Sequence, residues 1–209
     1  MNFFEGIDWV QKDTNDSGVE DTKDHLLKLY KEKTTAVIER LSEIGLPKKN
    51  EQIRLITKRS FNAVAFLQHV ISIEGQVDEA LFCIYSINYE ASVIINELVT
   101  SGKIKTATIL MSNLRNKAHR AKEQATKDFF VNNPNIELIF ASSHSKIMSF
   151  KTSENYYTVE GSGNLSYNSR IEQYIIDNDI SMFEFTKTWI NEIKVYLQGK
   201  KELTIYGKS

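Results

Sequence analysis

Polar residues between His144 and Glu172 have the types and spacing needed for chemistry on a phosphoryl group. His144 and Lys146 lie two residues apart in HSKIMSF, an apolar run typical of a strand, so both side chains are expected on one face. Asn164 lies in a GSGNLS turn whose flexible backbone would offer N–H donors to an anionic oxygen. The Glu172 carboxylate could hold a histidine N–H and fix the tautomer of the ring. The set indicates a phosphoryl site.

The series HxK, GSxN and then a glutamate resembles the half-site of the phospholipase D superfamily. The resemblance implies that His144 attacks phosphorus and that Glu172 orients it. Lys146 and Asn164 would bind the non-bridging oxygens. Because the chain carries one short half-site, it looks most like the small bacterial endonucleases of that superfamily, which act as homodimers. The resemblance therefore implies a phosphodiesterase that hydrolyses DNA through a covalent phosphohistidine and needs no metal ion.

One position departs from the family pattern. The family has an aspartate five residues after the lysine, and Lys151 stands there, which reverses the charge. This departure supports a first alternative, a catalytically silent module that binds nucleic acid or phosphate. A second alternative is a lipid phosphodiesterase or phosphatidyltransferase. Such an enzyme should expose an apolar or amphipathic membrane-docking surface, and the sequence shows no convincing one.

Further residues are candidates for holding the substrate. Ser162 and Ser166 lie in the turn, where each could bind a phosphate oxygen or simply brace the backbone. A basic helix is expected over residues 115–130. Most charge runs of this kind are solvated faces, but cations beside the His144 cleft would follow a phosphate backbone. The cations concerned are Arg115, Lys117, Arg120 and Lys122.

Composition restricts the class of protein. The formal net charge is −1, so the chain lacks the overall basic excess of a non-specific nucleic-acid binder, and any contact with phosphates must be local. The single cysteine, Cys83, allows no intrachain disulfide. No apolar run reaches membrane-spanning length, and the N-terminus does not resemble a signal peptide. We therefore expect a cytoplasmic protein without stable membrane association.

Motifs for cofactors and metals are missing from the sequence. It contains no Gly-rich P-loop, HExxH helix, paired-cysteine motif or aspartate cluster. GSGNLS is also not a dinucleotide fingerprint, because Ser166 stands where the third glycine is needed. We therefore predict no cofactor and no metal ligands.

The apolar pattern alternates between strand and helix periods from Gln52 onward. Strands are expected over 53–57, 80–87, 106–112, 136–143, 144–150, 156–160 and 172–177, and helices over 61–73, 90–102, 115–130 and 182–197. This alternation predicts an α/β sandwich with a mixed central sheet flanked by helices, as the phospholipase D resemblance also implies. An amphipathic helix over 21–44 precedes it. We divide the chain into an N-terminal extension, residues 1–50, and a phospholipase D-like domain, residues 51–209.

Overall fold

The structure is a computed structural model of the 209-residue chain, and it describes residues 41–57, 62–113, 117–166 and 171–199. In chain order its elements are β1 (Gln52–Thr57), α2 (Val64–Glu74), β2 (Val77–Ile84), α3 (Tyr89–Thr100), β3 (Ile104–Ser112), α4 (Lys117–Phe130), β4 (Ile136–Ala141), β5 (Ile147–Lys151), β6 (Tyr156–Gly161), β7 (Glu172–Asn178) and α5 (Ile180–Gly199).

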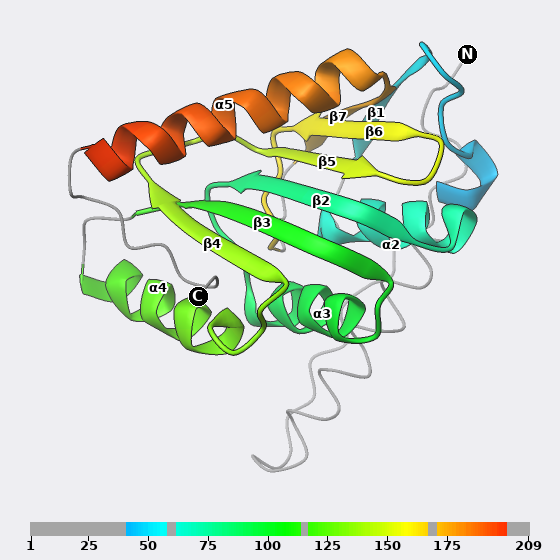
Figure 1. Cartoon of the computed structure of the whole chain (residues 1–209). Helices are drawn as coiled ribbons and strands as arrows, with labels where there is room; N and C mark the ends of the chain where they lie inside the picture. The colour runs from blue at the N-terminus through cyan, green and yellow to red at the C-terminus, as the bar shows by residue number, and fades with distance from the viewer. Residues whose placement is uncertain (1–40, 58–61, 114–116, 167–170, 200–209) are drawn as a thin grey trace.

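In the described part of the chain, seven strands form one mixed sheet in the order β1-β7-β6-β5-β2-β3-β4 (Figure 1). Strands β2, β3 and β4 are parallel, because α3 and α4 return the chain to the starting edge between them. All other neighbouring strands are antiparallel. β5 joins the antiparallel part of the sheet to the parallel part by pairing with β2. In this pairing Cys83 lies opposite Ile147.

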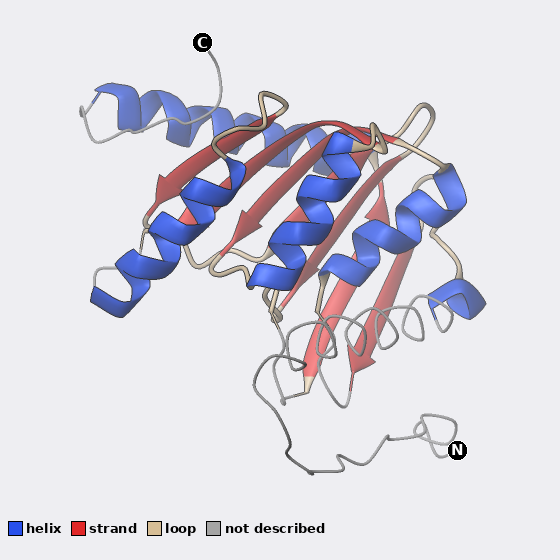
Figure 2. Cartoon of the chain, turned by 90° about the horizontal axis from the view of Figure 1, so that it is seen from below, coloured by secondary structure: helices blue, strands red, loops and turns tan. Residues whose placement is uncertain are grey.

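Helices cover both faces of the sheet. α2, α3 and α4 lie on one face and α5 lies on the other (Figures 1 and 2). The central strand β2 is consequently buried on both sides. Phe82 packs against Phe150 on the first face, with ring centroids 5.9 Å apart, and Cys83 joins the cluster around Phe183 of α5 on the second. The predicted fold class, a mixed sheet flanked by helices, is confirmed.

The start of α3 is fixed beside the connection between β6 and β7. Asn88 caps α3, because its Oδ1 accepts a hydrogen bond from the Ala91 N–H at 3.0 Å. The backbone N–H of Asn88 donates to the Leu165 carbonyl at 2.8 Å, and Ile87 forms a parallel bridge with the same residue. The loop after β2 therefore holds the GSGNLS segment in place.

Three predicted strand boundaries near the candidate site are wrong. The strand expected over 136–143 is β4, which ends at Ala141. The strand expected over 80–87 is β2, which ends at Ile84 because residues 85–87 lead into the α3 cap. The strand expected over 144–150 is β5, which begins only at Ile147. Residues 41–44 are helical, and the helix ends at Gly45 (φ 76°), as predicted. The remainder of the helix expected over 21–44 lies outside the described residues, so the division at residue 50 stays a prediction.

Candidate functional site

The segments that carry the predicted site meet at one edge of the sheet. The loop between β4 and β5 carries His144 and Lys146, at the edge where β2, β3 and β4 have their carboxyl ends. β6 ends at this edge, and the backbone N–H of Gly161 donates to the Lys146 carbonyl at 3.2 Å. β7 begins there with Glu172. Ligand sites of open α/β sheets lie beyond the carboxyl ends of parallel strands, so this is the position expected of a binding site.

His144 and Lys146 contact each other directly. Lys146 Nζ lies 3.3 Å from His144 Nδ1 and donates to the His144 carbonyl oxygen at 3.1 Å. The loop turns because the Ser145 N–H donates to Ser143 Oγ at 3.2 Å, a local hydrogen bond that competes with strand pairing. That turn explains why β5 begins at Ile147 and why the predicted strand through His144 is wrong. The histidine and the lysine nevertheless form a pair.

An aromatic ring that the sequence analysis did not single out lies against this pair. Tyr85 is the first residue after β2, and its ring centroid lies 4.7 Å from that of His144. Lys146 Nζ lies 5.7 Å from the same tyrosine centroid. The sequence pattern could not indicate this contact, because it depends on the pairing of β2 with β5 and on the end of β2 at Ile84.

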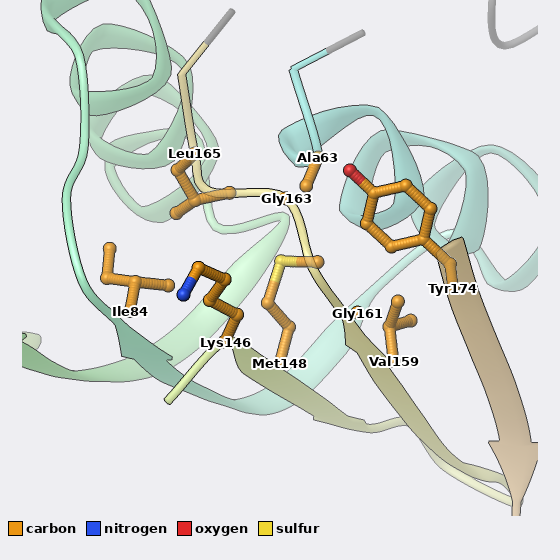
Figure 3. Close-up of a pocket in the computed structure, with 9 residues that line it drawn as sticks. All are labelled: Ala63, Ile84, Lys146, Met148, Val159, Gly161, Gly163, Leu165 and Tyr174. Atoms are coloured by element: carbon orange, nitrogen blue, oxygen red, sulfur yellow. The ribbon is translucent and has the colours of Figure 1, made fainter. Parts of the chain in front are cut away.

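Lys146 lines a small pocket between β2, β5 and the turn after β6 (Figure 3). The other lining residues are mostly apolar: Ala63, Ile84, Met148, Val159, Gly161, Gly163, Leu165 and Tyr174. Burial in these surroundings lowers the pKa of the Lys146 ammonium, and the negative charge of Glu172 acts in the opposite direction. Lys146 and Glu172 are therefore electrostatically coupled.

Glu172 is held by the connection between β6 and β7. Its side chain is 4% exposed, and its carboxylate accepts a hydrogen bond from Ser162 Oγ. Ser162 Oγ in turn accepts a hydrogen bond from the Gln173 N–H at 3.1 Å. Among the described residues, the polar side-chain partner of the His144 ring is Lys146. The predicted orientation of His144 by Glu172 stays a prediction, and Ser162 braces the glutamate.

The glycines of the turn make room for Tyr174. A Cβ on Gly161 or on Gly163 would overlap the Tyr174 side chain. The backbone N–H of Gly161 pairs with the loop before β5, and that of Ser162 pairs with β7. The expectation that the turn offers free N–H donors is wrong for these two residues, because sheet pairing continues through them.

Asn164 has hydrogen-bonding capacity that the fold leaves unused. It lies between Gly163 and Leu165, which both line the pocket, and its side chain is half-buried. Its Oδ1 is buried and has no hydrogen-bond partner within the described ranges. A buried amide oxygen that accepts no hydrogen bond costs free energy of folding, so such a group in a native structure needs an explanation. A donor group on a bound ligand would satisfy this oxygen, whereas a phosphate oxygen could be bound only by the Asn164 Nδ2 group.

Lys151, the position of the family aspartate, lies away from the pair. It is the last residue of β5, where it lies opposite Glu79 of β2 and Tyr156 of β6. Its Nζ lies 5.9 Å from the centroid of the Tyr156 ring. Five residues of extended chain separate it from Lys146 by about 16 Å. The charge reversal therefore does not place a second cation beside His144.

The remaining predicted substrate-binding residues are only partly described. Ser166 is half-buried beyond Leu165. Arg115 lies outside the described residues. α4 follows β3 and therefore starts at the same edge of the sheet as His144. It contains Lys117, Arg120 and Lys122. The structure does not describe these three side chains.

The described residues contain neither a cluster of metal-binding side chains nor a membrane-spanning helix. Within 41–57, 62–113, 117–166 and 171–199, no three His, Cys, Asp or Glu side chains lie together in a way that could hold a metal ion. No helix in those ranges combines the length and apolar character needed to cross a membrane.

Comparisons with known proteins do not assign a family. No family model matches the chain, and no curated protein matches it in sequence. Similar solved structures include polyphosphate kinase from Porphyromonas gingivalis, at 12% identity and a TM-score of 0.44 over 61% of this chain and 23% of the kinase. Phosphatidylserine synthase from Haemophilus influenzae Rd KW20 matches at 12% identity and 0.44, over 75% of this chain and 40% of the synthase.

A third similar structure is TrmBL2, an archaeal chromatin protein described as showing a novel mode of DNA binding. It matches at 16% identity and a TM-score of 0.46, over 85% of this chain and 65% of TrmBL2. The chain thus spans less than two thirds of each of these three proteins. TM-scores below 0.5 at such identities carry no argument about activity, and the functional inference depends on the residues themselves.

Proposed function

We propose that this chain is a metal-independent phosphodiesterase of the phospholipase D type that acts through a covalent phosphohistidine. The observation that carries the proposal is the meeting of His144, Lys146 and the Asn164 turn at the carboxyl edge of the parallel strands. The histidine and the lysine come from one loop, and the amide comes from a separate segment of the chain. A nucleophile, a cation and an amide whose Nδ2 group can donate to a phosphate oxygen are the groups that a phosphoryl-transfer site needs.

The reaction has two steps. In the first, a ring nitrogen of His144 attacks phosphorus, the P–O bond to the leaving alcohol breaks, and an N–P bond forms. A second histidine donates the proton that the leaving oxygen takes up. In the second step that histidine removes a proton from water, the water oxygen attacks phosphorus, and the N–P bond breaks. Lys146 and Asn164 stabilise the negative charge that develops on the non-bridging oxygens.

The second histidine comes from a second copy of the chain in this proposal. Of the two histidines whose side chains the structure describes, His144 lies at this edge of the sheet and His69 is buried within α2. A two-fold axis would bring two copies of the site to one shared cleft, which an isologous interface allows. The first alternative function, a silent binding module, would not need this arrangement.

We expect the 24.0 kDa chain to be a homodimer in solution. Sedimentation equilibrium at micromolar concentration should give twice the chain mass, because each chain supplies one half of the acid and nucleophile pair. A species that sediments as a monomer and retains full activity at the same concentration would rule out the shared site.

The proposed substrate is DNA. α4 begins after β3, at the edge that carries His144, and its first half is rich in lysine and arginine. Cations at that position would contact phosphates that extend away from the reacting bond. Because the whole chain has a formal net charge of −1, such contacts would be confined to this region.

The proposal is tested by a substrate panel in EDTA. Wild-type protein should hydrolyse a chromogenic phosphodiester and cleave single- or double-stranded DNA with EDTA present, and it should leave phosphatidylcholine vesicles intact. Activity that EDTA abolishes and a divalent cation restores would refute the metal-independent route. Cleavage of the vesicles alone would favour the lipid enzyme, and DNA binding without cleavage of any substrate would favour the silent module.

A further inference from the structure

We propose that Tyr85 is a positioning residue for this site and that its ring holds the His144 imidazole and the Lys146 ammonium in their reactive arrangement. The inference rests on the phosphodiesterase function proposed above. Tyr85 belongs to none of the motifs that carry the family resemblance.

Tyr85 is placed by backbone that is fixed at several points. β2 ends one residue before it and is hydrogen-bonded to β5 on one side and β3 on the other. Two residues after it, Ile87 bridges to Leu165, and Asn88 caps α3. The phenol ring, which is half-buried, therefore projects from a short segment held at both ends.

The group that Tyr85 contacts is less constrained. His144 is exposed and lies in a loop, so its side chain can adopt several rotamers before a substrate binds. The Tyr85 and His144 rings are tilted by 59° with centroids 4.7 Å apart, within the range of favourable aromatic pairs. The aromatic contact thus selects one orientation of the imidazole.

The same ring also contacts the cation. Lys146 Nζ lies 5.7 Å from the Tyr85 centroid, inside the distance at which an ammonium is attracted to an aromatic ring. Lys146 Nζ is also 3.3 Å from His144 Nδ1, so tyrosine, histidine and lysine form a closed triangle of contacts. Removing the tyrosine ring would leave His144 and Lys146 held by their contact with each other, without the aromatic face that orients both. Because a misplacement of about 1 Å can cost roughly 10²-fold in rate, the triangle should affect turnover more than substrate binding.

Substitution of Tyr85 separates the contribution of the ring from that of the hydroxyl group. Tyr85→Leu should lower kcat by about 10- to 100-fold and change KM by less than about threefold, because it removes the aromatic face and keeps most of the volume. Tyr85→Phe keeps the face and should retain kcat within about threefold. Tyr89→Leu is the matched control, since Tyr89 is 67% exposed and its ring contacts Phe129.

Thermal unfolding and single-turnover rates of covalent intermediate formation are measured for each variant. If Tyr85→Leu does not fold, Tyr85→Met replaces it. A leucine or methionine variant with wild-type kcat overturns the proposal, and so does a Tyr85→Phe variant as slow as Tyr85→Leu. These outcomes differ from failure of the phosphodiesterase function itself, which would show as an active His144→Ala protein.

Discussion

His144→Ala should lower the turnover of a phosphodiester by about 10³-fold or more, while the protein still folds and still forms its dimer. The histidine supplies the nitrogen that becomes bonded to phosphorus, so no other group can replace it at the same distance. Its side chain is exposed in the loop before β5, and its removal opens no cavity in the core. Steady-state kinetics on a chromogenic phosphodiester, with thermal unfolding alongside, measure both quantities.

Ser142→Ala is the matched control for this variant. Ser142 is exposed in the same loop, two residues before the histidine. Its substitution should leave turnover unchanged. A His144→Ala protein that keeps wild-type turnover, in a preparation free of contaminating nuclease, would contradict the proposed function and favour the silent binding module.

Lys146→Met should lower turnover by about 10²- to 10³-fold, because it removes a charged donor that stabilises the transition state and keeps the length of the side chain. The methionine should also pack into the mostly apolar pocket that Lys146 now lines, so the stability should change little (Figure 3). Lys105→Met is the control. Lys105 is an exposed lysine, paired with Asp78, near the start of β3, at the opposite edge of the sheet. Equal losses for both variants would show that Lys146 has no particular role.

The environment of Lys146 also predicts the direction of a pH effect. Burial lowers the pKa of Lys146, so the cation is lost, and activity with it, at a lower pH than for an exposed lysine. The charge of Glu172 counteracts this shift in the pKa of Lys146. In Glu172→Gln the alkaline limb of the kcat/KM profile should therefore move to lower pH, whereas in Lys146→Arg it should move to higher pH, because guanidinium stays charged.

The fold was largely predictable because its signals are local. Strand and helix periods follow each other in the sequence, and a buried strand such as β2 is an apolar run wherever it lies in the sheet. The order of the strands was not predictable from this pattern. It is set by long-range pairing, for example the antiparallel pairing of β2 with β5, which brings Tyr85 to His144.

The motif in the sequence grouped residues that lie near one another in the fold, but it did not indicate most of their contacts. His144, Lys146 and Asn164 do lie at the same edge of the sheet, as their spacing in the motif suggested. The predicted roles of the neighbouring glycines and of Ser162 were incomplete. Gly163 makes room for the ring of Tyr174, and Ser162 donates a hydrogen bond to Glu172. Such contacts depend on how β6 packs beside β7. They cannot be predicted from the sequence of the turn by itself.

The covalent intermediate is the most direct test of the central claim. Wild-type protein is mixed with a phosphodiester labelled at phosphorus, denatured with alkali in mid-turnover, and digested for peptide mapping. Label is expected on the peptide that contains His144, and it should be stable to alkali and released by acid, as is typical of an N–P bond. The label should be absent from His144→Ala treated in the same way. Rapid turnover with no label on protein, or label on another residue, would contradict the account.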